Sequence, residues 1–394
     1  MAEKKAVNKV VEPTNEEIDA HVDQLVAKAQ VALSKFEEFT QEQVDYIVAK
    51  CSVAGLDAHG TLAEAAVNET GRGVFEDKAV KNLFACEYVT SNLRHLKTVG
   101  IINEDPLLGI TEIAEPVGVV CGIVPTTNPT STVIFKSLIC LKTRNPIIFS
   151  FHPSAHACSV MAAVVIRDAA IAAGAPEDCI QWLDLKSMYA TTALMKHPGV
   201  ATILATGGNA MVAAAYSCGK PALGVGAGNV PAYVEKTCVL PRAVNDIVLS
   251  KSFDNGMICA SEQAAIVDTE IYDAFMKEIK RFKVYFVNKE EKAKLETFMF
   301  GAVAYSDNVN AAKLNPNVVG KPATWIAEQA GFKVPEDTQI ICAECKEVGP
   351  NEPLTREKLS PVLAVLKAKN TDDGILKATQ MVEFNGLGHS AAIH

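Results

Sequence analysis

The sequence predicts an α/β protein built on an open, mostly parallel β-sheet. Of its 394 residues, 49% are hydrophobic but only 6% are aromatic, a composition typical of the aliphatic core between parallel strands and covering helices. The run 116–124 is continuous, apolar and rich in β-branched residues, and a helical stretch at 131–142 follows it. Strand-like and helical segments alternate from there onward, which is typical of βαβ units in a parallel sheet.

The same pattern divides the chain into three parts. We expect residues 1–110 to form a helical region packed on a first α/β domain at 111–235, with a second α/β domain at 236–394. The chain stops inside a strand-like pattern, so we expect the last domain to be C-terminally incomplete. Beyond the helical starts near residues 15 and 40, the expected helices are 62–67, 76–96, 131–142, 156–173, 193–197, 210–217, 242–250, 271–282, 289–298, 324–331 and 372–383. The expected strands are 116–124, 146–151, 179–183, 200–205, 264–267 and one that ends near 365.

The composition argues against several classes of protein. The formal net charge is −9 and no basic block stands out, so nucleic-acid binding has little support. The apolar runs are far shorter than the ~20 residues of a membrane helix, and the polar N-terminus lacks a signal-peptide core. Eleven scattered cysteines indicate reduced thiols and a cytoplasmic location. Cys342 and Cys345 form a lone C-x-x-C pair without a zinc-spaced histidine, so no metal site is expected.

Cys259 is a candidate nucleophile. It follows the turn signal Asn255-Gly256 and precedes the strand-like segment 264–267. A cysteine on a tight loop can have its thiolate stabilised by surrounding backbone N–H groups, and the thiolate is the reactive form. The alternative is a small buried apolar residue, which is the commoner role of a cysteine.

Three loops that follow predicted strands are candidate ligand sites. Residues 125–129, 152–154 and 206–209 should lie along one edge of the sheet, because ligands of open parallel sheets bind at the carboxyl ends of strands. The glycine run 224–228 is not followed by a helix, so it fails as a dinucleotide fingerprint. Thr206-Gly207-Gly208 precedes a helix and is the better phosphate neighbour. A plain turn is the alternative for each glycine pair.

Five segments resemble a known family when they are taken in order. They are PTTNPTS at 125–131, VGAGN at 225–229, FDNGMICASEQ at 253–263, EKLSP at 357–361 and GHS at 388–390. Together they resemble the CoA-acylating branch of the aldehyde dehydrogenase superfamily over nearly the whole chain. The resemblance is closest to the N-terminal aldehyde dehydrogenase half of bifunctional aldehyde/alcohol dehydrogenases. It implies an open parallel-sheet NAD-binding domain beside a catalytic thiol domain, with the C-terminus truncated.

The resemblance implies a role for each matching residue. Cys259 takes the nucleophile position, and Asn128 forms an oxyanion hole with the backbone N–H of Cys259. Glu357 matches the glutamate near the nicotinamide ribose, and His389 matches a histidine near the thiol and CoA, although a structural histidine is the alternative. The resemblance and the strand-end argument together give the expected NAD-binding set: Ile123, Val124, Pro125, Thr126, Thr127, Asn128, His152, Pro153, Thr206, Gly207, Gly208, Gly226, Ala227 and Glu357.

One position departs from the hydrolytic members of the superfamily. Those enzymes have a glutamate where this chain has Val225, 34 positions before Cys259. A valine cannot act as the base that activates water. The resemblance therefore implies a thioester on Cys259 that survives until the thiol of CoA arrives.

The implied reaction is the reversible, NAD-dependent reduction of acetyl-CoA to acetaldehyde, the first step of ethanol formation in fermentation. The parent protein would add a metal-dependent alcohol dehydrogenase domain and form a homo-oligomer or helical filament. The alternatives are an acylating dehydrogenase for butyraldehyde or succinate semialdehyde, and an inactive fragment of a filament-forming enzyme. The loop at 152–154 has neither a clear acid nor an arginine for the adenosine ribose, so NAD rather than NADP rests on the family.

Overall fold

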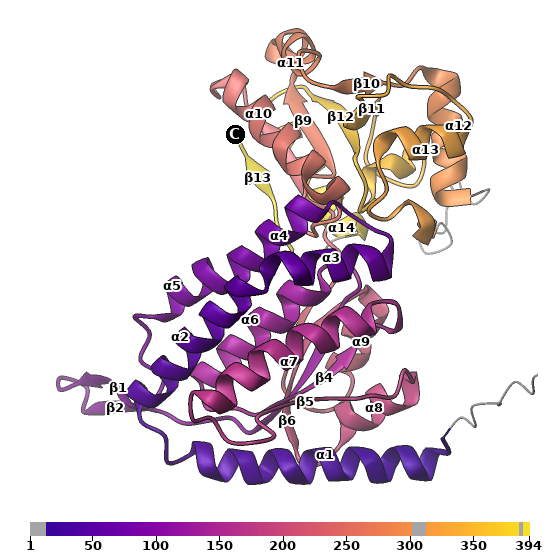
Figure 1. Ribbon diagram of the computed structural model, residues 1–394. Coiled ribbons are helices and arrows are strands. Elements are labelled where there is room, and N and C mark those ends of the chain that lie inside the picture. The colour runs from indigo at the N-terminus through magenta and orange to yellow at the C-terminus, as the bar shows by residue number, and fades with distance from the viewer. Residues whose placement is uncertain (1–12, 302–312, 386–388) are drawn as a thin grey trace, which may run out of the picture.

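The computed structural model describes residues 13–301, 313–385 and 389–394. It has two lobes, each built on one sheet, and helices α3 and α4 of the N-terminal region lie at their junction (Figure 1). The sheets contain five and six strands, and every strand pair in both is parallel. This confirms the α/β class that the alternation of segments predicted.

The first sheet has the strand order β5-β4-β3-β6-β7. Its strands are β3 (Val119–Val124), β4 (Ile147–Phe151), β5 (Ile180–Trp182), β6 (Val200–Thr206) and β7 (Ala222–Val225). The central strand β3 is buried on both faces: Val120 and Val124 pack in one core cluster, and Val119, Cys121 and Ile123 pack in another. Its covering helices are α6 (Pro129–Lys142) and α7 (His156–Ala172) on one face and α1 (Asn15–Phe36), α8 (Met188–Lys196) and α9 (Asn209–Tyr216) on the other.

The second sheet has the order β10-β11-β12-β9-β8-β13. Its strands are β8 (Pro231–Val234), β9 (Ala264–Asp268), β10 (Val284–Phe286), β11 (Ile340–Glu344), β12 (Val362–Ala368) and β13 (Ala392–Ile393). One face is covered by α10 (Leu240–Ser252) and α11 (Tyr272–Ile279), and the other by α12 (Lys289–Phe300), α13 (Ala323–Ala330) and α14 (Thr371–Asn385). β8 belongs to this sheet although it precedes the expected domain boundary at residue 236.

The N-terminal region is helical for most of its length. It contains α2 (Gln41–Asp57), α3 (His59–Thr70), α4 (Phe75–Leu83), the π-helical turn η1 (Phe84–Tyr88) and α5 (Val89–Leu93). Thr40 caps α2 through a capping box with Gln43, as its sequence predicts. The stretch expected as one helix at 76–96 is instead divided by the π-turn, a feature that apolar periodicity does not report.

Several strands were not expected from the sequence. The antiparallel hairpin of β1 (Gly100–Asp105) and β2 (Ile110–Ala114) crosses the expected boundary at residue 110. The hairpin exposes apolar and polar side chains alike, so it lacks the clean two-residue alternation that marks a half-buried strand. Strands β7, β8, β10 and β11 were also missed.

One helical segment is longer and more apolar than expected from the sequence, in which no run was found as long as a membrane helix. The segment Pro153–Ala172 is long and apolar enough to cross a membrane by length and composition alone. Within this fold α7 places Ala162, Ala163 and Ile166 in the core cluster that it shares with α2 and α6. Packing inside the first lobe therefore accounts for its apolar character.

Gly122 in β3 tests how tightly the first sheet packs. A Cβ there would lie 2.8 Å from Cδ1 of Phe149 and 2.9 Å from Cδ1 of Ile147, both in the core. We expect Gly122→Ala to lower the free energy of unfolding by roughly 1–3 kcal/mol through overpacking. Urea unfolding followed by circular dichroism measures this. Gly60→Ala in α3 is the matched control, because a Cβ at Gly60 has nothing within 4 Å; equal losses in the two variants would contradict the packing argument.

Candidate active site

The site lies where opposite edges of the two sheets face each other. The loops that follow β3, β4 and β6 come from the carboxyl edge of the first sheet. The segments that precede β8, β9 and β12 come from the amino edge of the second sheet, and they hold Gly226, Cys259 and Glu357 respectively. Between these edges lies a cleft of about 690 Å³.

Cys259 occupies a turn between the 3-10 helix η3 (Phe253–Gly256) and β9. The chain reverses sharply there: Asp254 and Asn255 have left-handed φ values of 50° and 52°, a conformation that Asp and Asn tolerate better than most residues. Gly256 follows with φ 65°, and a Cβ on it would lie 2.5 Å from the carbonyl oxygen of Ser360. Cys259 is half-buried and lines the cleft, so it is not one of the core cysteines.

The cleft contains the whole set of residues that the sequence assigned to the cofactor. All of these side chains or backbone groups line it: Ile123, Val124, Pro125, Thr126, Thr127, Asn128, His152, Pro153, Thr206, Gly207, Gly208, Gly226, Ala227 and Glu357. Their roles stay predictions, but their common location fits a dinucleotide. Gly207 and Gly208 lead directly into α9, and the start of that helix lines the cleft through Gly208 and Ala210, as a helix N-terminus near an anion would.

Glycine is required where the loop before β8 passes α9. A Cβ on Gly226 would lie 2.6 Å from Oδ1 of Asn209, the oxygen that accepts a hydrogen bond from the backbone N–H of Ala227 at 2.9 Å. Asn209 is the first residue of α9. The contact therefore holds the 226–227 backbone against the start of the helix that would face a phosphate.

The thiol of Cys259 has two charged neighbours of opposite sign. Burial raises the pKa of Cys259, the carboxyl of Glu357 raises it further, and the ammonium of Lys81 lowers it. Burial also raises the pKa of Glu357 to about 7, although the backbone N–H of Gly228 donates to its Oε1 at 2.8 Å. Glu357 therefore changes charge near neutral pH, beside the thiol.

His389 lies close to Cys259 but does not line the cleft. A Cβ on Gly228 would be 2.9 Å from Cγ of His389 and 2.4 Å from the carbonyl oxygen of Cys259, so Gly228 is the spacer between them. Nδ1 of His389 is 3.0 Å from Oγ of Ser390, and its buried Nε2 has no hydrogen-bond partner among the described residues. Burial lowers the pKa of His389, which favours the neutral imidazole at pH 7.

Asn128 ends the loop after β3 and occupies the N-cap position of α6, where its side chain makes no capping hydrogen bond. Its Oδ1 accepts a hydrogen bond from Nζ of Lys81 at 2.7 Å, and its Nδ2 donates to Oγ1 of Thr127 at 3.2 Å. Val225 also lines the cleft. It stands at the position where the hydrolytic members of the superfamily have a glutamate. Among the described residues that line the cleft, Glu357 is the only carboxylate.

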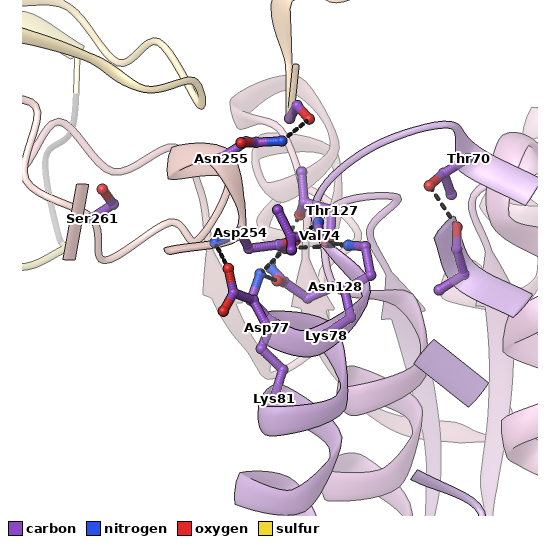
Figure 2. A network of polar contacts seen from close by, with 12 residues as sticks. Thr70, Val74, Asp77, Lys78, Lys81, Thr127, Asn128, Asp254, Asn255 and Ser261 are labelled. Carbon is purple, nitrogen blue, oxygen red and sulfur yellow. Dashed lines mark hydrogen bonds and ion pairs between the residues drawn. The ribbon is translucent and has the colours of Figure 1, made fainter. Parts of the chain in front are cut away.

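Sequence reasoning missed a buried ion cluster under the site. Asp254 is fully buried and pairs with Lys78 and Lys81, at 3.2 and 2.5 Å, as Figure 2 shows. The two lysines are three residues apart in a helix, a spacing that predicts a shared face but does not tell a buried face from a solvated one. From the sequence, Asp254 is only a member of the motif at 253–263 and has no role of its own. In the described part of the chain, no cluster of His, Cys, Asp or Glu could hold a metal ion.

The comparisons with known proteins agree on one family. The model of the family described as "Aldehyde dehydrogenase family" matches residues 3–382 of this chain. Aldehyde-alcohol dehydrogenase 2 of Entamoeba histolytica is 72% identical over 379 residues, which are 96% of this chain but 44% of that protein. The chain thus spans less than half the length of that relative.

Two solved structures extend the comparison to the fold. An acetylating aldehyde dehydrogenase from Geobacillus thermoglucosidasius matches with a TM-score of 0.91 and 44% identity over 98% of this chain and 83% of that one. A propionaldehyde dehydrogenase of Rhodopseudomonas palustris, solved with bound CoA and an acylated cysteine, matches with a TM-score of 0.81 and 29% identity over 95% of this chain and 82% of that one. The family that the five sequence motifs predicted is confirmed: the chain belongs to the aldehyde dehydrogenase family.

Proposed function

We propose that this chain is an NAD-dependent, CoA-acylating aldehyde dehydrogenase that interconverts acetyl-CoA and acetaldehyde. The observation that carries the proposal is the position of Cys259 in a cleft that it shares with the nucleotide-binding loops, with Val225 where a hydrolytic base would be. The acetylating activity named for the Geobacillus enzyme, and the CoA and acylated cysteine of the Rhodopseudomonas structure, support it.

The first half-reaction transfers the acyl group to the protein. The thiolate of Cys259 attacks the thioester carbon of acetyl-CoA, and a new C–S bond forms. Nδ2 of Asn128 and the backbone N–H of Cys259 donate hydrogen bonds to the oxyanion, as preorganised donors whose value is greatest in a site that excludes water. The C–S bond to CoA then breaks, the CoA thiolate takes a proton, and an acetyl thioester remains on Cys259.

The second half-reaction releases acetaldehyde. The loops after β3, β4 and β6 would hold the nicotinamide cofactor, which in its reduced form would supply the hydride that reduces the thioester carbonyl. Asn128 and the backbone of Cys259 again hold the oxygen that becomes negative. The C–S bond to Cys259 then breaks, so acetaldehyde leaves and the thiolate returns. The balance is acetyl-CoA, NADH and a proton to acetaldehyde, CoA and NAD⁺.

The residues around the thiol suit thioester transfer better than hydrolysis. Val225 has no proton acceptor. Glu357 accepts a hydrogen bond from Gly228 and has a pKa of about 7, so it is partly protonated at neutral pH. Ionisation of Glu357 raises the pKa of the neighbouring thiol. The neutral form of Glu357 therefore favours the Cys259 thiolate.

The setting of the reaction is also part of the proposal. We propose a cytoplasmic enzyme that performs the first step of ethanol formation, within a longer protein that carries a metal-dependent alcohol dehydrogenase domain and forms homo-oligomers or filaments. The name of the Entamoeba relative and the 44% of it that the chain covers support the second domain. A profile of acyl-CoA chain lengths distinguishes acetyl-CoA from butyryl-CoA and succinyl-CoA.

Acetylation of the protein tests the nucleophile directly. With acetyl-CoA and no nicotinamide, peptide mapping by mass spectrometry should find acetylation at Cys259 alone. Cys259→Ala should lose this modification and slow the reduction of acetyl-CoA by at least about 10³-fold, while it still binds NADH. Cys238→Ala is the matched control, because Cys238 is also half-buried but does not line the cleft. Acetyl transfer that persists in Cys259→Ala would refute the assignment.

Restoring a base at the cleft tests the role of Val225. Val225→Glu should release acetate from acetyl-CoA, with a rate up to about 10²-fold above that of the unmodified chain, because a carboxylate can activate water against the thioester. Val225→Gln controls for shape and polarity and should release none. Acetate measured by enzymatic assay decides between them. If both variants behave like the unmodified chain, exclusion of water rather than the missing base limits hydrolysis.

A further inference from the structure

The ammonium group of Lys81 joins three parts of the active site. Lys81 lies on α4, and its side chain is only 8% exposed. Nζ donates to Oδ1 of Asn128 at 2.7 Å and pairs with Oδ2 of Asp254 at 2.5 Å. It also lies 5.7 Å from the centre of the Phe253 ring, within the range of a cation–π contact. Asp254 and Phe253 belong to the turn that leads to Cys259, so Lys81 contacts both this turn and the loop after β3. Figure 2 shows Lys81 with Asn128 and Asp254.

The contact with Lys81 decides which way the Asn128 amide faces. An ammonium group has only donors, so the group that meets it must be the carbonyl oxygen Oδ1. The NH₂ group is then at the other end, and Thr127 Oγ1 accepts one of its two hydrogens. The second hydrogen is left for an oxyanion. The reversed amide would place donors against the ammonium, which the buried position of Lys81 makes unfavourable.

Asp254 keeps this cation charged in a buried place. Burial lowers the pKa of Lys81, whereas the carboxylate of Asp254 opposes that shift. Lys78 and Asp77, also on α4, complete the set of charges around Lys81: Lys78 shares the Asp254 carboxylate, and Asp77 accepts a hydrogen bond from the backbone N–H of Asp254 at 2.7 Å. A buried carboxylate with these partners is satisfied only if the lysines are protonated.

Among the described residues, three titratable groups lie around Cys259, each from a different segment: Lys81 and Glu357 act on its thiol, and His389 lies near its backbone carbonyl. Lys81 comes from α4, Glu357 from the loop before β12, and His389 from the loop before β13. Burial and Glu357 raise the pKa of the thiol, and burial keeps His389 neutral at pH 7. Lys81 is therefore the one positive charge in this set that favours the thiolate.

We infer that Lys81 is a positioning residue for the reaction proposed above, which orients the Asn128 amide toward the oxyanion and stabilises the Cys259 thiolate. The inference has two parts, and only the first, the orientation of Asn128 toward the oxyanion, rests on the proposed function. The second part, the Cys259 thiolate, concerns the free protein and can be tested without acetyl-CoA, aldehyde or nicotinamide. Lys78 offers a matched comparison, because its ammonium contacts Asp254 at 3.2 Å and the carbonyl of Thr127 at 3.3 Å instead of the Asn128 side chain.

The first experiment measures the pH dependence of alkylation by iodoacetamide in the full chain, with Cys259 quantified by peptide mapping. Lys81→Met should raise the pKa of the thiol by about one unit, so that alkylation at pH 7 slows by about tenfold and the whole alkylation profile moves to higher pH by the same amount. Lys81→Arg should keep the original profile, because it keeps the charge. Lys78→Met should also keep it, although it removes a cation from the same carboxylate. A Lys81→Met profile that matches the unmodified chain would overturn the inference.

A double variant keeps the test decisive if Lys81→Met does not fold. Lys81→Met/Asp254→Asn removes the cation together with its counter-charge, and the amide oxygen of Asn can still accept from the N–H of Val74, which donates to Asp254 Oδ1 at 2.7 Å. It should show the same rise in thiol pKa. A pKa equal to that of Asp254→Asn alone would refute the role of Lys81.

The second experiment tests the orientation of Asn128 toward the oxyanion. Acetylation of Cys259 by acetyl-CoA is followed near neutral pH, and each maximal rate is divided by the fraction of thiolate that the alkylation profile gives for that variant at the same pH. Lys81→Met should remain slower than the unmodified chain by about tenfold or more in the maximal rate with little change in half-saturation, because the donor acts only on the developing oxyanion. Equal maximal rates of acetylation in Lys81→Met and the unmodified chain would refute the role of Lys81 in orienting Asn128 and leave only its effect on the Cys259 thiolate. If the unmodified chain is not acetylated but the alkylation shift is present, the proposed function fails while the thiolate role of Lys81 stands.

Discussion

The buried carboxylate of Asp254 is the interaction on which the active site depends. It accepts from the backbone N–H of Val74 and pairs with Lys78 and Lys81, so it ties the turn before Cys259 to helix α4. A charge without solvent needs such partners, because its desolvation is otherwise uncompensated. Close approach makes this possible: Gly73 has φ 81°, and a Cβ on it would lie 2.1 Å from Oδ1 of Asp254.

This arrangement makes helix α4 of the N-terminal region part of the structure that supports the cleft. From the sequence the N-terminal helices look like a collar without chemistry of its own. In the fold α4 lies at the junction of the two lobes (Figure 1), and its lysines contact residues from both. Asn128 comes from the first lobe and Asp254 from the second, so their relative position is held by a third element that is remote from both in sequence.

The two lobes contribute to the cleft in different ways. The first supplies the loops at the carboxyl ends of its strands, as open parallel sheets do. The second supplies the segments that enter its strands at their amino ends, which carry Cys259, Glu357 and His389. Glycine at positions 226 and 228 lets these segments pass within contact distance of α9 and of one another. Cys259 and the loops that follow β3, β4 and β6 therefore line one cavity.

The sequence by itself determined the parts that depend on local pattern and on motif. The α/β class and the strand-end loops follow from apolar periodicity, and Cys259 follows from its place after a turn. The resemblance to the family added Gly226, Ala227 and Glu357, and all of these line the cleft with Cys259. The hairpin β1–β2, the π-turn inside the expected helix at 76–96 and strands β7, β8, β10 and β11 were missed, and the exposed hairpin lacks a clear apolar period. Only the tertiary structure showed that Lys81 and Asp254 are buried together beside Asn128, since pairing between residues 173 positions apart leaves no signal in either local sequence. Burial turns these charged residues into a fixed electrostatic support for Cys259, and burial is a property of the folded chain.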